Sequence, residues 1–251
     1  MFDLNGKIAL VTGSSRGIGR AIAQKLSDAG ATVIIHGKSE GQTLNDTAEY
    51  IKSLGGKVYM EHADMSKPQE IEQMYLRIKD KFGRLDILVN NAAILSREAF
   101  LDLHWEEWDR IMQTNARGYF LSSQFAAKLM IPNQWGRIIN VSSISQYDAA
   151  CGRIHYCASK AAIGMLTKGL ALELSEYGIT ANSVLPGSIH TDFNDDVLSD
   201  KDYYKNCVDS IPLGRIGKAE DIAGAVVMLA AEESSYISGA EIVIDGAKTV
   251  Y

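Results

Sequence analysis

Ile8-Ala9-Leu10-Val11-Thr12-Gly13-Ser14-Ser15-Arg16-Gly17-Ile18-Gly19 is the stretch that decides the fold. The apolar run at its start predicts a buried strand, and the glycines stand between that strand and a helical pattern. A diphosphate needs backbone N–H groups pointing at it, and a helix N-terminus supplies them together with a partial positive charge. Glycines let the anion and the helix approach closely. The stretch therefore predicts a turn that binds the phosphates of a dinucleotide.

Short apolar runs alternate with helical patterns along the rest of the chain. The further candidate strands are Thr32–Ile35, Val58–Glu61, Ile87–Val89, Arg137–Val141, Thr180–Leu185 and Glu241–Ile244. Most are continuous apolar runs, which is typical of strands covered on both faces. Stripes with a 3.6-residue period lie between them, and two of these end at Gly30 and Gly83. We expect a single α/β domain, a Rossmann-type doubly wound parallel sheet of about seven strands with helices on both faces.

Length and composition bound the possible classes of protein. A chain of 251 residues with 46% hydrophobic and 22% charged residues fits one globular domain over 1–251. A net charge of -6 gives no reason to expect nucleic acid or an anionic membrane as partner. No signal segment or membrane span is visible, and three cysteines argue against a disulfide framework. We expect a cytoplasmic protein with no metal site, and a polar substrate flap at about residues 190–210.

A tyrosine and a lysine far downstream are candidates for acid/base chemistry. Tyr156 and Lys160 are four residues apart, so on a helix both would point at one site. A phenol with a pKa near 10 is a poor base at neutral pH, but a neighbouring ammonium favours the phenolate and lowers that pKa. Tyr75 and Lys79 have the same spacing, but Tyr75 lies on an apolar stripe and is interpreted as a core residue.

These two motifs together resemble the classical short-chain dehydrogenase/reductase family. The glycine spacing is Gly-x-x-x-Gly-x-Gly, and Tyr-x-x-x-Lys follows downstream. The resemblance runs from about Lys7 to Ile244 and departs from the family at Ala93, where most members have glycine. The other positions that carry it are Asp64, Asn90, Asn91, Ala92, Asn115, Ser143, Pro186, Gly187 and Thr191.

The resemblance implies an oxidoreductase that interconverts a secondary alcohol and a carbonyl by hydride transfer. It implies that Tyr156 transfers the proton and that Lys160 lowers the pKa of Tyr156 and holds the nicotinamide ribose. Ser143 would hydrogen-bond the substrate oxygen, and Asn115 would link Lys160 to solvent through water. The implied cofactor-binding residues are Gly13, Ser15, Arg16, Gly17, Ile18, Gly19, Gly37, Lys38, Ser39, Asp64, Asn91, Ala92, Tyr156, Lys160, Pro186, Gly187, Ile189 and Thr191.

The residues after the second candidate strand bear on the choice of dinucleotide. An NAD site usually places Asp or Glu about 20 residues past the glycines, where it binds the ribose 2′-OH. Here Gly37 takes the acidic position by resemblance, Lys38 follows it, and Arg16 can approach the same ribose. Two cations and no carboxylate suit a 2′-phosphate, so we predict NADP(H) rather than NAD(H). The alternative is that both cations are solvated surface charges.

Three functions stay open at this point. The first is oxidation or reduction of a small polar molecule, a sugar, polyol or ketone, because polar side chains near the predicted site and in the flap could supply hydrogen bonds, namely Ser145, Gln146, Tyr147, His155 and His190–Ser210. The run from Pro212 to Asp221 is similar to glucose 1-dehydrogenase-like members, but this similarity is too widely shared in the family to name a substrate. The second is reduction of a 3-oxoacyl group on acyl-carrier protein. It ranks lower because Gln134 and Tyr177 stand where carrier-docking members tend to have basic residues, and because an acidic carrier would meet an acidic chain. The third is a non-catalytic NADP-sensing protein. Family members are commonly tetramers, so we expect a homotetramer.

Overall fold

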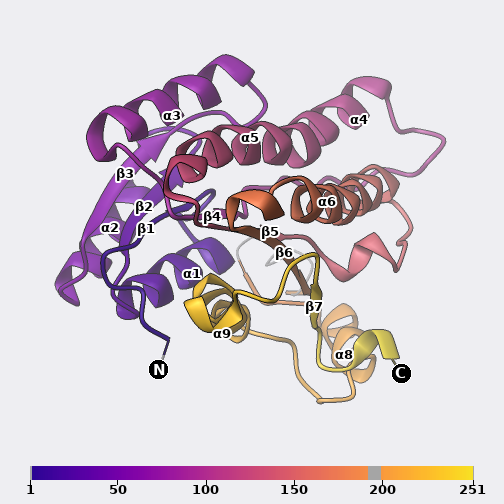
Figure 1. The fold of residues 1–251 in the computed structure, drawn as a ribbon. Coiled ribbons are helices and arrows are strands. Elements are labelled where there is room, and N and C mark those ends of the chain that lie inside the picture. The colour runs from indigo at the N-terminus through magenta and orange to yellow at the C-terminus, as the bar shows by residue number, and fades with distance from the viewer. Residues whose placement is uncertain (1, 192–198, 251) are drawn as a thin grey trace.

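The computed structural model describes residues 2–191 and 199–250. Its seven strands form one parallel sheet in the order β3-β2-β1-β4-β5-β6-β7 (Figure 1). The strands are β1 (Ile8–Val11), β2 (Thr32–Gly37), β3 (Val58–His62), β4 (Ile87–Asn90), β5 (Gly136–Val141), β6 (Ile179–Pro186) and β7 (Glu241–Ile244). The α-helices are α1 (Gly17–Asp28), α2 (Gln42–Ser53), α3 (Pro68–Phe82), α4 (Trp105–Met112), α5 (Gly118–Met130), α6 (Ile154–Glu173), α8 (Lys201–Asp209) and α9 (Ala219–Ala230). The predicted doubly wound sheet is confirmed.

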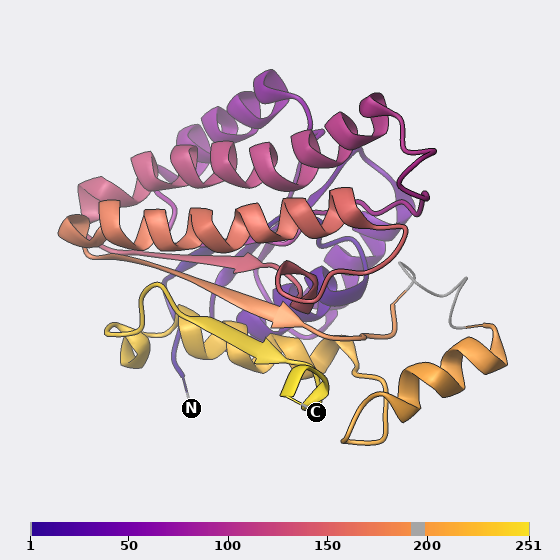
Figure 2. The ribbon, with the colours of Figure 1, turned by 90° about the vertical axis from the view of Figure 1, so that its right-hand side faces the viewer.

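Helices cover both faces of the sheet. Helices α1, α2 and α9 lie on one face, and α3, α5 and α6 lie on the other (Figures 1 and 2). Along β1, Ala9 and Val11 pack into the core of the first face, and Leu10 packs into the core of the second. Successive side chains of a strand point to opposite faces, so a strand buried on both faces needs an unbroken apolar run. That is why β1 could be recognised from its sequence.

The chain reverses its direction of winding between β1 and β4. Strands β2 and β3 extend the sheet on one side of β1, and β4 to β7 extend it on the other. The carboxyl ends of β1 and β4 therefore lie side by side with their following loops diverging to opposite faces. A parallel sheet binds ligands at this crevice. The fold thus places the residues after β1, β4, β5 and β6 around one opening.

Several element boundaries differ from the sequence prediction. Strand β2 continues beyond Ile35 to Gly37, so the predicted ribose position is the last residue of a strand. Helix α3 ends at Phe82 and is capped by the predicted Gly83, which has the left-handed conformation (φ 71°) that glycine adopts readily. Part of the predicted flap is helical, because α8 begins at Lys201 and the Asp200 side chain caps its first backbone N–H groups. Residues 192–198 of that flap lie outside the described residues.

A π-helical turn joins α4 to α5 in one continuous rod. It spans Gln113–Arg117 and contains the fully buried Asn115. Such a turn inserts one residue into the helix and redirects a side chain, often at a functional site. In the described part of the chain, no helix combines the length and apolar character needed to cross a bilayer.

Candidate active site

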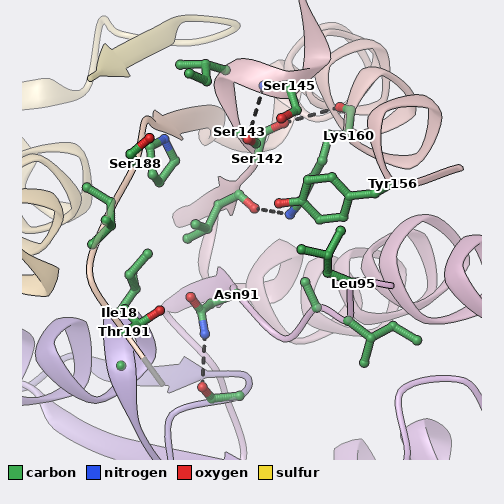
Figure 3. A pocket seen from close by; sticks show the side chains of 18 of the residues that line it. Ile18, Asn91, Leu95, Ser142, Ser143, Ser145, Tyr156, Lys160, Ser188 and Thr191 are labelled. Atoms are coloured by element: carbon green, nitrogen blue, oxygen red, sulfur yellow. Dashed lines mark hydrogen bonds between the residues drawn. The ribbon is translucent and has the colours of Figure 1, made fainter. Parts of the chain in front are cut away.

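A cavity of about 650 Å³ opens at the carboxyl edge of the sheet. Its wall includes the glycine turn after β1, the segment after β4, Ser143 after β5, Tyr156 and Lys160 on α6, and the segment after β6. Figure 3 shows Tyr156 and Lys160 pointing into the space that Ile18, Asn91 and Thr191 face from the other side. The predicted phosphate turn and the predicted acid/base pair thus line one crevice.

The glycine turn is packed too closely for side chains. A Cβ atom at Gly13 would lie 2.7 Å from the Cα of Ala92, and one at Gly19 would lie 2.3 Å from the carbonyl oxygen of Gly13. The Asn91 amide donates hydrogen bonds to the carbonyls of Thr12 and Gly13 and so joins the turn to β4. Helix α1 begins at Gly17 without a side-chain cap at Arg16 and with no acidic residue in its first turn. This helix N-terminus fits an anion such as a diphosphate.

His36 anchors the glycine turn, a role that the sequence analysis missed. The Gly13 N–H donates to the Nδ1 atom of His36 over 3.0 Å, so the proton must lie on Nε2, which donates to the carbonyl of Ala63 over 3.0 Å. Ser14 adds two hydrogen bonds with the backbone of the same histidine. Burial is the main cause that lowers the pKa of His36 to about 4. A polar residue at the end of an apolar strand was the signal for this anchor.

We expect the neutral form of His36 to make protein stability depend on pH. The folded pKa of about 4 lies below the ordinary 6.5, so the unfolded chain binds the proton between those values and stability falls as pH drops from 6.5 to 4. This pKa shift corresponds to a loss of folding free energy on the order of 3 kcal/mol over that pH range. In urea unfolding at pH 7, 5 and 4, His36→Asn should lose less stability than the unmodified chain. His104→Asn, at an exposed position, is the control, and equal losses in all three proteins would contradict the assignment.

Two cations line the end of the cavity near β2. Lys38 and Arg16 are both part of the wall, whereas Gly37, Ser39 and Asp64 are not. Lys38 forms an ion pair with Asp64 at 3.0 Å, with its side chain 78% exposed. Partial burial opposes ionisation of Asp64, but hydrogen bonds from Ser66 and Lys38 outweigh it and lower the pKa of Asp64 to about 2. Asp64 therefore faces Lys38 and Ser66, and its neighbours Ala63 and Met65 line the cavity in its place.

Tyr156 and Lys160 lie one turn apart on α6. The Lys160 ammonium donates to the carbonyl of Val141 over 2.9 Å and lies 5.6 Å from the centroid of the Tyr156 ring. Burial lowers the pKa of Lys160 to about 7. Burial also raises the pKa of Tyr156 to about 12, although hydrogen bonding with Ser143 and the nearby charge of Arg153 oppose that rise. The phenol is thus neutral at physiological pH and is placed to donate a proton.

Asn115 lies behind the cavity wall and not on it. Its amide donates to the carbonyl of Ile94 over 2.9 Å and to the Ser159 hydroxyl over 3.2 Å, and its oxygen accepts from the Ile94 N–H over 2.9 Å. Ile94 lines the cavity, so Asn115 fixes the segment after β4 through the π-helical turn. The water-mediated link between Asn115 and Lys160 stays a prediction.

The remaining predicted positions are accounted for. Pro186, Gly187, Ile189 and Thr191 line the cavity after β6, next to Ser188. Tyr75 is a core residue as predicted, hydrogen-bonded to Ser122 and with its pKa raised by burial. The cavity wall also contains charged residues that the sequence analysis did not assign, namely Arg97, Asp148, Arg153 and Lys248.

Comparison with known proteins covers almost the whole chain. The family model described as enoyl-(acyl carrier protein) reductase matches residues 13–248. The chain is 39% identical over 245 residues to 3-oxoacyl-(acyl-carrier-protein) reductase FabG of Aquifex aeolicus, covering 97% of each chain. It is 36% identical over 251 residues to glucose 1-dehydrogenase 2 of Bacillus subtilis, covering 99% of this chain and 97% of that one.

Solved structures agree with this similarity. A gluconate 5-dehydrogenase from Burkholderia cenocepacia J2315, in complex with NADP and tartrate, superposes with a TM-score of 0.95 at 32% identity and covers 100% of this chain and 98% of that one. A short-chain type dehydrogenase/reductase from Mycobacterium marinum superposes with a TM-score of 0.94 at 39% identity over the same shares. The likeness extends over the whole chain.

Proposed function

This chain belongs to the short-chain dehydrogenase/reductase family, and on that basis we propose that it is an NADP(H)-dependent oxidoreductase for small polar substrates. The reaction interconverts a secondary alcohol and a carbonyl. The observation that carries the proposal is that Ser143, Tyr156 and Lys160 line the same cavity as the glycine turn. A protein that only senses the nucleotide needs the glycine turn but not these three residues. Their presence therefore supports an enzyme rather than a sensor.

The proposed roles follow from the geometry of the trio. NADP(H), when bound, supplies or accepts the hydride at its nicotinamide ring. In the direction of reduction, Tyr156 donates its phenolic proton to the substrate oxygen as the carbonyl carbon gains the hydride. In oxidation the phenolate takes that proton back. In its protonated form, Lys160 would favour the phenolate through its charge, and Ser143 would hold the substrate oxygen where negative charge develops.

Two cations support the preference for NADP(H). Arg16 and Lys38 line the end of the cavity next to the glycine turn, where the adenosine ribose would lie. The related gluconate 5-dehydrogenase was solved with NADP. A 2′-phosphate would bind to Lys38 in competition with Asp64, the carboxylate that holds this lysine in the free protein. Arg16 is therefore proposed as the second phosphate ligand.

Relatives favour a second candidate function. Reductases of the 3-oxoacyl-(acyl-carrier-protein) type are 39% and 41% identical to this chain in Aquifex aeolicus and Haemophilus influenzae. Against it stand Gln134 and Tyr177, which carry no positive charge at positions where carrier-docking members tend to have basic residues. Steering of an acidic carrier protein toward a chain of net charge -6 is also unfavourable.

A substrate panel tests these candidates. With NADPH, we expect kcat/KM for small free ketones and keto sugars to be at least about tenfold higher than kcat/KM for acetoacetyl-acyl-carrier protein. For the same ketones, we expect kcat/KM with NADPH to be at least about tenfold higher than with NADH. The reaction is followed by absorbance of the reduced nicotinamide. A higher kcat/KM for the carrier thioester would make the second candidate correct. NADPH binding without turnover on any carbonyl would instead indicate a sensor.

We also propose that the chain forms a homotetramer. Large apolar side chains on α4 and α6 face outward, among them Trp105, Met165 and Leu172 with exposed fractions of 70%, 70% and 79%. Burying such side chains against a second copy would stabilise an assembly through the hydrophobic effect. Cys151, Cys157 and Cys207 form no disulfide, which fits the proposed cytoplasmic location.

A further inference from the structure

Some residues of the cavity wall are not assigned to cofactor binding. Among these, positive side chains outnumber negative ones. Arg97 comes from the segment after β4, Arg153 precedes α6, and Lys248 lies in a short turn near the C-terminal end. Among the described residues that line the cavity, Asp148 is the single carboxylate. This local charge is opposite in sign to the net charge of the chain, which is -6.

The two arginines are held near one another by the backbone. The Glu98 N–H donates to the carbonyl of Gly152 over 2.9 Å, which joins the segment after β4 to the turn before α6. Arg97 and Arg153 are the residues directly adjacent to the two ends of this bond. Gly152 has φ 71°, a left-handed backbone conformation that would be strained for a residue with a side chain, so glycine suits this turn before α6.

These cations have no carboxylate partner in the described part of the chain. Ion pairs occupy Arg77, Arg84, Arg110, Arg137 and Arg215. Within residues 2–191 and 199–250, no ion pair or hydrogen bond joins the side chain of Arg97, Arg153 or Lys248 to an acidic group, and the Asp245 carboxylate meets Lys248 only through its backbone N–H. Arg153 is half-buried, and partial burial of an uncompensated guanidinium is unfavourable. A ligand that brings negative charge would remove this penalty.

Arg153 also lies close to the reacting groups. It precedes Tyr156 by three residues, one turn along the start of α6. Its charge acts on the Tyr156 phenol and pulls the pKa of that phenol down. An anionic group bound by Arg153 would therefore lie near the Tyr156 phenol, the proposed proton donor.

We infer that the substrate carries a carboxylate, so that the enzyme acts on hydroxy acids and their oxo acids, with Arg97, Arg153 and Lys248 as the anion site. This inference rests on the proposed function and narrows its substrate class. A guanidinium binds a carboxylate through two parallel N–H donors, which fixes the orientation of the substrate as well as its charge. Neutral sugars would leave the three cations without a partner.

A matched pair of substrates tests the inference. 5-Keto-D-gluconate and L-sorbose share one ketone and three secondary hydroxyl groups, and differ in a carboxylate in place of a terminal hydroxymethyl group. We expect kcat/KM with NADPH to be at least about 30-fold higher for the keto acid, the equivalent of about 2 kcal/mol. Equal values for the two, or a preference for L-sorbose, would overturn the inference. D-Fructose 6-phosphate is the third substrate. A higher kcat/KM for this phosphate ester than for the keto acid would overturn the choice of a carboxylate.

Variants locate the anion site. Arg97→Gln should raise KM for the keto acid about tenfold or more and leave kcat/KM for L-sorbose within a factor of about two, because Arg97 has no contact with the acid/base pair. Arg97→Lys should restore part of the loss by restoring the charge. Arg20→Gln is the control, since Arg20 stacks on Tyr50 and does not line the cavity. An equal loss for both substrates in Arg97→Gln would show a merely structural role.

A binding measurement separates this inference from the proposed function. D-Gluconate and D-sorbitol are titrated calorimetrically into the protein saturated with NADP⁺. Tighter binding of D-gluconate that Arg97→Gln abolishes supports the anion site even if no ketone is reduced, a result that would refute the proposed function alone. Equal binding of both polyols, or binding of neither, overturns the anion site whatever the turnover.

Discussion

Replacing Tyr156 by phenylalanine should lower kcat by about 10²- to 10⁴-fold, the range that a positioned proton donor contributes. The substitution keeps the aromatic ring and removes only the hydroxyl group, which lies beside Ser143 and Lys160 at the cavity wall. NADPH affinity should change by no more than about twofold. Turnover by absorbance and Kd by fluorescence titration give the two values.

Tyr75→Phe is a matched control for that experiment. Tyr75 also stands four residues before a lysine, but its hydroxyl is buried against Ser122 on the far side of the core. We expect a loss of stability of about 1 kcal/mol and an unchanged kcat. A Tyr156→Phe protein with kcat close to that of the unmodified chain would remove the basis of the proposed mechanism.

Gly19→Ala should weaken NADPH binding by about 10²-fold or more. The new Cβ would lie 2.3 Å from the Gly13 carbonyl oxygen and 2.5 Å from the Asn91 amide nitrogen, so the turn that meets the phosphates must shift. Overpacking of this kind also destabilises a protein, by about 1–3 kcal/mol. Fluorescence titration with NADPH and urea unfolding measure the two effects separately.

Gly224→Ala controls for the substitution itself. Gly224 lies inside α9, and a Cβ atom there would meet nothing within 4 Å. Alanine in a helix interior is about 0.5–1 kcal/mol more favourable than glycine, so this variant should gain stability and keep its NADPH affinity. If Gly19→Ala bound NADPH as tightly as Gly224→Ala does, the glycine turn would not be the phosphate site.

The sheet could be predicted because burial of its inner strands on both faces requires one recognisable sequence pattern. Strands covered by helices on both faces need unbroken apolar runs, and β1 has this form with bounds that match the prediction. The edge strand β3 is less regular, since Tyr59 and Met60 are exposed there. Helix α8 was missed because its segment is mostly polar and none of its residues is fully buried; Cys207 and Val208 pack only against the small cluster of Ile211 and Ile216.

The site could be predicted only where local spacing determines it. Tyr156 and Lys160 share a helix, and their common orientation follows from a four-residue interval. The anchoring of Gly13 by His36 and the bond between Glu98 and Gly152 join residues far apart in the chain. A local pattern can mark a residue such as His36 but does not specify its distant partner, so the neighbourhood of Arg97 and Arg153 became visible in the folded structure alone.

The bond between Glu98 and Gly152 joins two surface segments, whereas Gly13 is tied through His36 to a central strand. Arg97 is exposed, and replacing a side chain at the surface usually changes stability by less than about 0.5 kcal/mol. If the proposed sites are correct, side chains such as Arg97 can be exchanged at little cost in stability, whereas the residues around the glycine turn cannot. Substrate recognition could therefore change in evolution while nucleotide binding is kept.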